Sequence, residues 1–283
     1  MKKFILSLLA IFIFCTTAIA ENTKNIKFVQ VTDAHLSASS DYTQKVLKSA
    51  IADINTLQDV SFVVFTGDNI NNPDEKNLKT FLKIVKKLKV PYYIAIGDHD
   101  VYKANGLSKV RYYDMIHENN WFMFRHQPNF KFKKKGFVFL IVDGAKEIIP
   151  GSVGYYREGT LEWLEQELAK NEKDDVIILQ HFPVVYPDNS ESSVKSHKTY
   201  KVEEYKELLD KHHNVLAVLS GHFHSNSENM TNGVYHISTP SLIALPQAYK
   251  VIDIVTTKDF SPIIYTQLRE FEVKESVLFW TDL

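Results

Sequence analysis

Short, continuous apolar runs rich in valine, isoleucine and aromatic residues punctuate this chain of 283 residues. Runs of this kind are typical of strands that are buried on both faces of a sheet. They occur at residues 26–31, 60–65, 90–96, 137–142, 176–179 and 215–219. We therefore predict a buried strand at each of these positions.

Between these runs lie segments whose apolar residues recur at helical spacing, at residues 42–57, 77–88, 160–168 and 202–209. Strands that alternate with helices indicate the α/β class. After about residue 233 the pattern changes to short strands without intervening helices, at residues 234–238, 249–255, 262–268 and 276–280. We predict a layered α/β fold, α+β in its C-terminal part, with an antiparallel portion there.

The first 20 residues have the layout of a secretory signal peptide, with two lysines, an apolar run and small residues before Ala20. The run is shorter than the roughly 20 residues needed to span a bilayer, so we expect cleavage after Ala20 and no stable membrane anchor. The protein is therefore predicted to be exported, to a bacterial periplasm or to the extracellular space. Cys15, the single cysteine, would be removed, and the mature protein would have no disulfide.

Residues 21–283 are predicted to form a single domain, because no repeat or low-complexity linker divides them. Removal of Lys2 and Lys3 leaves 33 − 2 = 31 basic residues against 34 acidic ones, a net charge of 31 − 34 = −3. Nucleic-acid binders are usually strongly basic, so we expect no nucleic-acid partner, and a secreted nuclease is a less favoured alternative. The one basic cluster, at residues 131–135, is interpreted as a solvated turn.

Five of the predicted strands lead directly into aspartate or histidine residues. These residues are Asp33, His35, Asp68, Asp98, His99, Asp100, His181, His222 and His224. Taken singly, an aspartate there is most often a turn former or helix cap, and a lone histidine is most often structural. Together they indicate a metal site, because ligands bind at the carboxyl ends of strands and carboxylate and imidazole suit Mn, Fe and Zn.

The same residues form an ordered series that resembles the signature of the calcineurin-like metallophosphoesterases, which reads DxH, GD, GNH[DE], H and GHxH. In this chain the series is Asp33-x-His35, Gly67-Asp68, Gly97-Asp98-His99-Asp100, His181 and Gly221-His222-x-His224. The resemblance runs from about residue 26 to residue 240. It implies an α/β/β/α sandwich of two packed mixed sheets flanked by helices. It also implies a dinuclear metal hydrolase that acts on a phosphate mono- or diester of a small molecule, similar to the cyclic-nucleotide-phosphodiesterase branch.

The resemblance further implies a role for each residue. Two divalent ions, of Mn, Fe or Zn, would be bound, the first by Asp33, His35, Asp68 and His224 and the second by Asp68, Asp98, His181 and His222. A hydroxide that bridges the ions would attack phosphorus. His99 would contact the phosphate and protonate the leaving oxygen, and Asp100 would orient its ring, although Asp100 could equally cap a helix.

One position departs from the family pattern, because Asp98 stands where the family usually has asparagine. An aspartate binds a cation more strongly but offers no N–H group to the substrate. We expect tighter metal binding and weaker attraction for an anionic substrate. The departure keeps open a non-catalytic interaction module that has the same fold and binds metal.

Specificity is expected to come from loops at the rim of the site. The candidate loops are residues 112–126, 151–157 and 183–196. Tyr155, Tyr156 and Arg157 could bind a base or a phosphate, although aromatic residues serve most often in packing. The sequence does not distinguish a monoester from a diester.

Overall fold

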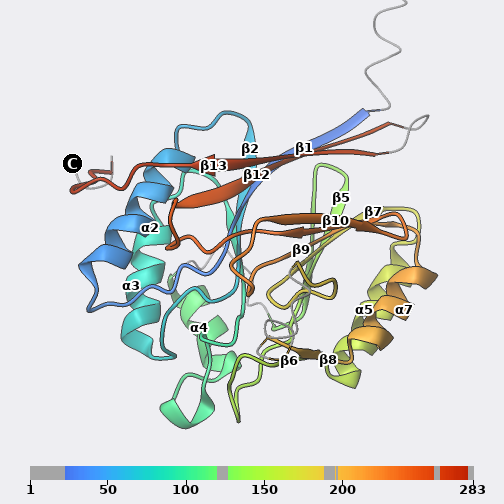
Figure 1. The fold of residues 1–283 in the computed structure, drawn as a ribbon, viewed down its shortest axis with the longest axis horizontal. Coiled ribbons are helices and arrows are strands. Elements are labelled where there is room, and N and C mark those ends of the chain that lie inside the picture. Colours follow the sequence, from blue (N-terminus) through green and yellow to red (C-terminus); the bar gives the residue numbers. More distant parts are fainter. Residues whose placement is uncertain (1–22, 120–126, 188–194, 196, 258–261, 280–283) are drawn as a thin grey trace, which may run out of the picture.

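The computed structural model describes residues 23–119, 127–187, 195, 197–257 and 262–279. Within these residues, two mixed β-sheets pack against each other and helices cover both outer faces (Figure 1). The predicted α/β/β/α architecture is therefore confirmed. The predicted signal peptide, residues 1–20, lies outside the described residues, and none of the described helices is long and apolar enough to cross a membrane.

The first sheet has the strand order β13-β12-β1-β2-β3, in which β1, β2 and β3 are parallel and β12 is antiparallel to both of its neighbours. Its strands are β1 (Thr23–Val31), β2 (Val60–Thr66), β3 (Tyr92–Ala95), β12 (Ala248–Thr257) and β13 (Ile263–Glu270). Two of the strands that the sequence predicts in an antiparallel part near the C-terminus thus join the sheet that begins with β1. The strand predicted at residues 234–238 belongs instead to the second sheet, where it is parallel to one neighbour and antiparallel to the other.

The second sheet has the order β10-β11-β9-β7-β5-β4, with parallel central strands and an antiparallel strand at each edge. Its strands are β4 (Phe130–Lys134), β5 (Phe137–Val142), β7 (Asp175–Gln180), β9 (Val215–Ser220), β10 (Ser227–Thr231) and β11 (Val234–Ser238). A separate two-stranded sheet is formed by β6 (Gly154–Tyr155) and β8 (Thr199–Tyr200).

Interlocking aromatic rings hold the two sheets together. Phe28 of β1 and Phe62 of β2 stack at 4.8 Å between ring centroids, and Phe139 of β5 meets them edge-on at 5.5 and 5.0 Å. All three side chains are fully buried. Such pairs contribute about 0.5–1.5 kcal/mol each beyond the burial of their apolar area. The core between the sheets thereby fixes their relative position, and with it the shared rim of their strands.

Helices α2 (Asp41–Ile54), α3 (Glu75–Val85) and α4 (Lys109–Asn119) lie on the outer face of the first sheet, and α5 (Glu158–Lys170) and α7 (Val202–Lys211) on that of the second (Figure 1). The side chains of Ser40 and Asp74 cap α2 and α3 by accepting hydrogen bonds from backbone N–H groups in the first turn. Such caps contribute about 1 kcal/mol each.

Three expectations for local structure need correction. The segment expected as a rim loop at residues 112–126 is helix α4 up to Asn119, and Tyr112 and Tyr113 are buried in the core; residues 120–126 lie outside the described part. Residues 276–279 form no strand. The lysine cluster lies largely in β4 rather than in a turn. Within β4, Lys131 pairs with Glu167 and Lys133 pairs with Asp174. These ion pairs offset part of the positive charge of this edge strand.

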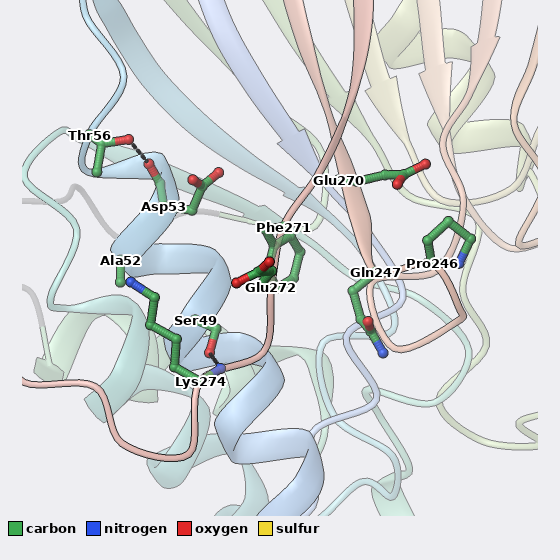
Figure 2. Close-up of a pocket in the computed structure, with 10 residues that line it drawn as sticks. All are labelled: Ser49, Ala52, Asp53, Thr56, Pro246, Gln247, Glu270, Phe271, Glu272 and Lys274. Carbon is green, nitrogen blue, oxygen red and sulfur yellow. Dashed lines mark hydrogen bonds between the residues drawn. The ribbon is translucent and has the colours of Figure 1, made fainter.

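A clamp joins α2 to the C-terminal strands. Asp53 accepts two hydrogen bonds from the Arg269 guanidinium, at 2.6 and 2.8 Å, and one from the Tyr249 hydroxyl at 2.5 Å. Beside this clamp, α2 and the chain after β13 line a pocket of about 420 Å³ (Figure 2). Its walls carry Asp53, Glu270, Glu272 and Lys274. The histidines and aspartates of the predicted metal site do not line this pocket.

Candidate metal centre

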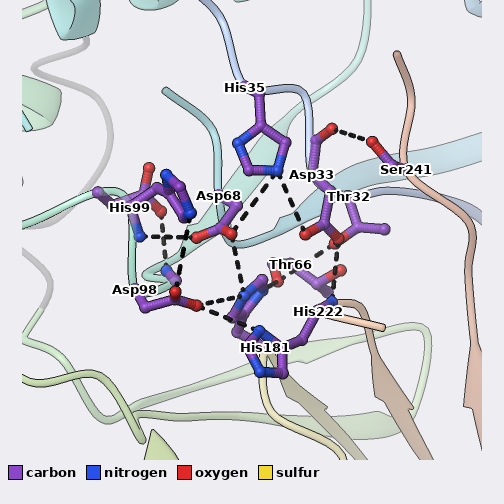
Figure 3. A network of polar contacts seen from close by, with 12 residues as sticks. Thr32, Asp33, His35, Thr66, Asp68, Asp98, His99, His181, His222 and Ser241 are labelled. Atoms are coloured by element: carbon purple, nitrogen blue, oxygen red, sulfur yellow. Dashed lines mark hydrogen bonds and ion pairs between the residues drawn. The ribbon is translucent and has the colours of Figure 1, made fainter. Parts of the chain in front are cut away.

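The predicted ligands all come from loops that follow parallel strands. Asp33 and His35 follow β1, Asp68 follows β2, Asp98 follows β3, His181 follows β7, and His222 and His224 follow β9. Because the carboxyl ends of these strands meet at one rim of the sandwich, the side chains converge there, and Figure 3 labels all of them except His224. The structure thus brings together all seven residues that the sequence nominates as ligands.

Three groups of candidate ligand atoms are found among the described residues, and the third, His35, Asp68 and His99, overlaps the site of the other two. The first group consists of Asp68, Asp98, His181 and His222, whose ligand atoms lie within 4.8 Å of one another. His181 Nε2 is 3.2 Å from Asp98 Oδ1 and 3.4 Å from Asp68 Oδ2. His222 Nδ1 is 3.2 Å from the same Asp98 oxygen. All four side chains are buried.

The second group consists of Asp33, His35 and His224. His224 Nε2 lies 3.1 Å from Asp33 Oδ1 and 3.3 Å from His35 Nε2. His35 Nε2 in turn is 3.8 Å from Asp68 Oδ2. Asp68 therefore offers one oxygen within 4 Å of a histidine from each group, which is the position that a shared ligand requires.

Neighbouring groups orient the inward-facing atoms. His181 Nδ1 donates to the Thr66 carbonyl at 2.9 Å, so its Nε2 atom faces the centre. Asp33 Oδ2 accepts hydrogen bonds from the Thr32 hydroxyl at 2.6 Å and from the His222 N–H at 3.1 Å, which leaves Oδ1 for the site. Outer contacts of this kind fix ring tautomers and carboxylate orientation at metal sites.

The backbone at the site is strained. Five of the seven predicted ligands have positive φ: Asp33 at 52°, His35 at 38°, Asp68 at 51°, His222 at 69° and His224 at 53°. This region is uncommon for residues other than glycine and costs about 1–3 kcal/mol per residue. The surrounding structure holds these sharp turns, and each turn directs a side chain into the common centre.

Two motif glycines are required because other atoms approach them closely. A Cβ atom on Gly97 would lie 2.1 Å from Asp68 Oδ1 and 2.4 Å from the Asp68 backbone nitrogen. A Cβ atom on Gly221 would lie 2.0 Å from Thr32 Oγ1 and 2.4 Å from Asp33 Oδ2. The glycines therefore allow the loop after β3 to pack against the Asp68 carboxylate and the loop after β9 to pack against the Asp33 carboxylate.

The charges at the centre favour a bound cation. Burial alone would lower the pKa of His181, but Asp68 and Asp33 raise it well above its usual value. Burial likewise opposes ionisation of Asp98, yet His181 and His222 hold the pKa of this carboxyl well below its usual range. Buried carboxylates are stable only with compensating positive charge. The carboxylate and imidazole donors, together with their convergence, fit divalent metal ions of the Mn, Fe or Zn type.

His99 lies at the open side of the centre, with 44% of its side chain exposed. Its Nε2 atom is 3.8 Å from Asp98 Oδ2, and its Nδ1 atom is 2.9 Å from the carbonyl oxygen of Asn71. Burial acts to lower the pKa of His99, but Asp68, the Asn71 carbonyl and Asp98 raise it overall. The position suits a group that exchanges a proton with a bound ester.

The expected role of Asp100 in orienting the His99 ring is wrong. Asp100 is fully buried and accepts hydrogen bonds from the backbone N–H groups of Gly97, Asn69 and Ile70 and from the Asn69 side chain. Burial, with a smaller contribution from Asp68, raises the pKa of this carboxyl to about 7. Asp100 therefore braces the loops after β2 and β3, and the carbonyl of Asn71 contacts the ring of His99.

Sequence reasoning missed His197. Its ring lies 5.0 Å from the ring of His222 and 5.0 Å from that of Phe223. It stands one residue beyond the candidate loop 183–196, of which residues 188–194 and 196 lie outside the described part, and no motif spacing marks it. Tyr156, by contrast, is buried and donates to the Phe182 carbonyl at 2.5 Å, which favours the packing interpretation for this residue.

Comparisons with known proteins agree with this geometry. The family model described as calcineurin-like phosphoesterase matches residues 26–226. A probable glycerophosphodiester phosphodiesterase, GpdQ, of Arcobacter nitrofigilis is 29% identical over 221 residues, which covers 75% of this chain and 77% of the relative. A probable cyclic nucleotide phosphodiesterase of Colwellia psychrerythraea is 24% identical over 227 residues, covering 77% and 78%.

Among solved structures, a dimetal phosphatase from Danio rerio superposes with a TM-score of 0.62 at 14% identity. The superposition covers 84% of this chain and 98% of that one, which shows a shared fold. The family match spans more than half of the chain and includes every strand that carries a predicted ligand. The chain therefore belongs to the calcineurin-like phosphoesterase family and is a metal-dependent phosphoester hydrolase.

Proposed function

We propose that this phosphoesterase hydrolyses phosphodiesters of small molecules and that it uses two divalent ions of manganese, iron or zinc. One ion is assigned to Asp33, His35, Asp68 and His224, and the other to Asp68, Asp98, His181 and His222. The observation that carries the assignment is the position of Asp68 Oδ2, 3.8 Å from His35 Nε2 and 3.4 Å from His181 Nε2. A shared carboxylate of this kind holds two cations close together.

Two ions bound there would activate a water and bind the oxygens of the phosphoryl group. The residues of the chain supply the rest. Asp33 and Asp68 each present one oxygen, because neighbouring N–H or O–H groups occupy the other. A hydrogen bond from Nδ1 to the Asn71 carbonyl orients the ring of His99, and the Nε2 atom is available to donate a proton to the leaving oxygen.

Charge supports a diester over a monoester. Asp33, Asp68 and Asp98 carry three negative charges, so two divalent ions leave the ligand set at +4 − 3 = +1, whereas an asparagine at position 98 would leave +2. A diester carries one negative charge and a monoester near neutral pH carries close to two. The less positive centre therefore favours the diester. The relatives from Arcobacter and Colwellia are both named as probable diesterases.

The test compares bis(4-nitrophenyl) phosphate with 4-nitrophenyl phosphate on the metal-loaded protein. We expect a kcat/KM at least tenfold higher for the diester, and a loss of about 100-fold in kcat for His99→Ala without loss of metal. The matched control is His213→Ala, an exposed histidine after α7, which should behave as the wild type. Bound metal without turnover of either ester would reject the proposal in favour of a non-catalytic metal-binding module.

We also propose that the protein is exported, because residues 1–20 have the layout of a signal peptide. The mature protein recovered from the periplasm or medium should begin at Glu21. Full-length protein that begins at Met1 and stays in the cytosol would contradict this.

A further inference from the structure

The two-stranded sheet of β6 and β8 lies against the metal centre. A Cβ atom on Gly154 of β6 would lie 2.5 Å from Cγ of Phe182, the residue that follows His181. The Tyr156 hydroxyl, one residue after β6, donates to the carbonyl of the same phenylalanine at 2.5 Å. Strand β6 is therefore packed on the loop that carries a predicted metal ligand.

Strand β8 begins close to the centre. His197, whose ring is 5.0 Å from that of His222, comes two residues before β8. At roughly 3.3 Å per residue of extended chain, Lys198 and Tyr200 lie within about 10 Å of His197 along the backbone. Both strands of this small sheet thus border the half of the centre formed by His181 and His222.

The side chains of this sheet combine aromatic rings with positive charge. The rings of Tyr155 and Tyr200 meet edge-on at 6.4 Å between centroids. The Arg157 guanidinium lies 5.9 Å from the Tyr155 ring, and the Lys198 ammonium lies 5.0 Å from the Tyr200 ring. Tyr200 is 52% exposed, unlike the buried Tyr156. These four residues, Tyr155, Arg157, Lys198 and Tyr200, are called the β6–β8 platform below.

The positive charge of the platform is only partly compensated. Asp143 is 3.9 Å from Arg157 but makes a much closer contact with Lys109, so one carboxylate serves two cations. Lys198 forms no ion pair with any residue that the structure describes. Exposed aromatic rings beside cations that are only partly compensated are the elements with which proteins bind planar, anionic ligands.

We propose that the β6–β8 platform binds the part of the substrate that lies beyond the scissile phosphate, and that this part carries a planar ring and a further negative group. The inference rests on the proposed diesterase function and adds a substrate class to it. The ring would stack on Tyr200, and the additional anion would contact Lys198 and Arg157.

The experiment uses two diesters that release the same nitrophenolate, the 4-nitrophenyl ester of thymidine 5′-phosphate and methyl 4-nitrophenyl phosphate. The metal-loaded wild type should favour the thymidine ester at least tenfold in kcat/KM, through a lower KM. Tyr200→Ala should reduce this ratio about tenfold. Tyr265→Ala, which removes an exposed tyrosine from β13, is the matched control and should keep the ratio.

The charge is tested by competition between ADP, which carries the additional anionic group, and AMP. Lys198→Gln should weaken inhibition by ADP about fivefold relative to inhibition by AMP, whereas Lys211→Gln, at an exposed position of α7, should not. If the wild type hydrolyses both diesters with no preference, or if Tyr200→Ala keeps the preference, the platform is refuted while the diesterase function stands. If neither diester is hydrolysed, the diesterase function fails. In that case the affinity for ADP is measured by calorimetric titration of the wild type and of Tyr200→Ala. A weaker affinity in Tyr200→Ala supports the platform, and an equal affinity in the two proteins overturns it.

Discussion

Substitution of Gly97 by alanine tests the close packing at the centre of the site. The new methyl carbon would start 2.1 Å from Asp68 Oδ1 and 2.4 Å from the Asp68 backbone nitrogen. Cβ atoms essentially never approach another atom more closely than 3.0 Å, so the methyl carbon and Asp68 Oδ1 must move apart by at least 3.0 − 2.1 = 0.9 Å. Oδ1 and the shared Oδ2 belong to one planar carboxylate, and metal–ligand distances tolerate only about 0.2 Å, so we expect Oδ2 to leave the position from which it would serve both ions.

We therefore expect Gly97→Ala to lose at least one equivalent of metal and to lower kcat about 100-fold, which is the usual effect of misplacing a catalytic group by about 1 Å. The free energy of unfolding should fall by about 1–3 kcal/mol, as is typical of overpacking. Metal content is measured by mass spectrometry of the digested protein, folding by circular dichroism, and activity with bis(4-nitrophenyl) phosphate.

The matched control is Gly159→Ala in α5, where an added Cβ atom would meet nothing within 4 Å. This variant should keep its metal and its activity, and alanine should stabilise the helix slightly. If Gly97→Ala is folded, binds two metal ions and turns over like the wild type, the close approach to Asp68 is not required and the reasoning is wrong.

Three further predictions concern charge. Asp98→Asn should raise turnover roughly threefold or more and relax the preference for diesters, because the centre becomes more positive and gains an N–H donor; equal or lower turnover with intact metal would contradict this. Asp53→Asn should lower the free energy of unfolding by about 1–2 kcal/mol in urea titrations, since it removes the charge from a bond to Arg269 that is only partly exposed. Asp41→Asn, in an exposed pair, should change little, and an equal loss in both would refute the clamp. Burial, with a contribution from Lys206, lowers the pKa of His236 from its ordinary value of 6.5 to about 4 in the folded protein. As the pH falls from 6.5 toward 4, the unfolded chain therefore binds a proton that the folded protein does not, and the stability that is fully present above pH 6.5 is lost. His236→Gln should remove up to about 3 kcal/mol of that pH dependence, and an unchanged slope would contradict it.

The strands and their terminal ligands were predictable because buried parallel strands have a local signature. Continuous apolar runs placed β1, β2, β3, β7 and β9, and a polar residue after each run marks the rim. Convergence then follows from topology alone. The fold and the candidate ligand set are therefore largely contained in the pattern of the chain.

Features that depend on tertiary contacts were not predictable. Helix α4 contains charged residues and aromatic ones side by side, so its periodicity is weak, and only packing of Tyr112 and Tyr113 into the core identifies it. The role of Asp100 depends on backbone N–H groups from the loop after β2, about 30 positions earlier. The nearness of His197 to His222 likewise joins segments that no sequence spacing relates.

The requirement for metal is the central claim, and one titration tests it most directly. The protein is stripped with a chelator and then titrated with manganese while hydrolysis of bis(4-nitrophenyl) phosphate is followed. We predict no activity in the stripped protein and full recovery as two equivalents per chain bind. Hydrolysis that persists without metal, or no hydrolysis at any loading, would contradict it.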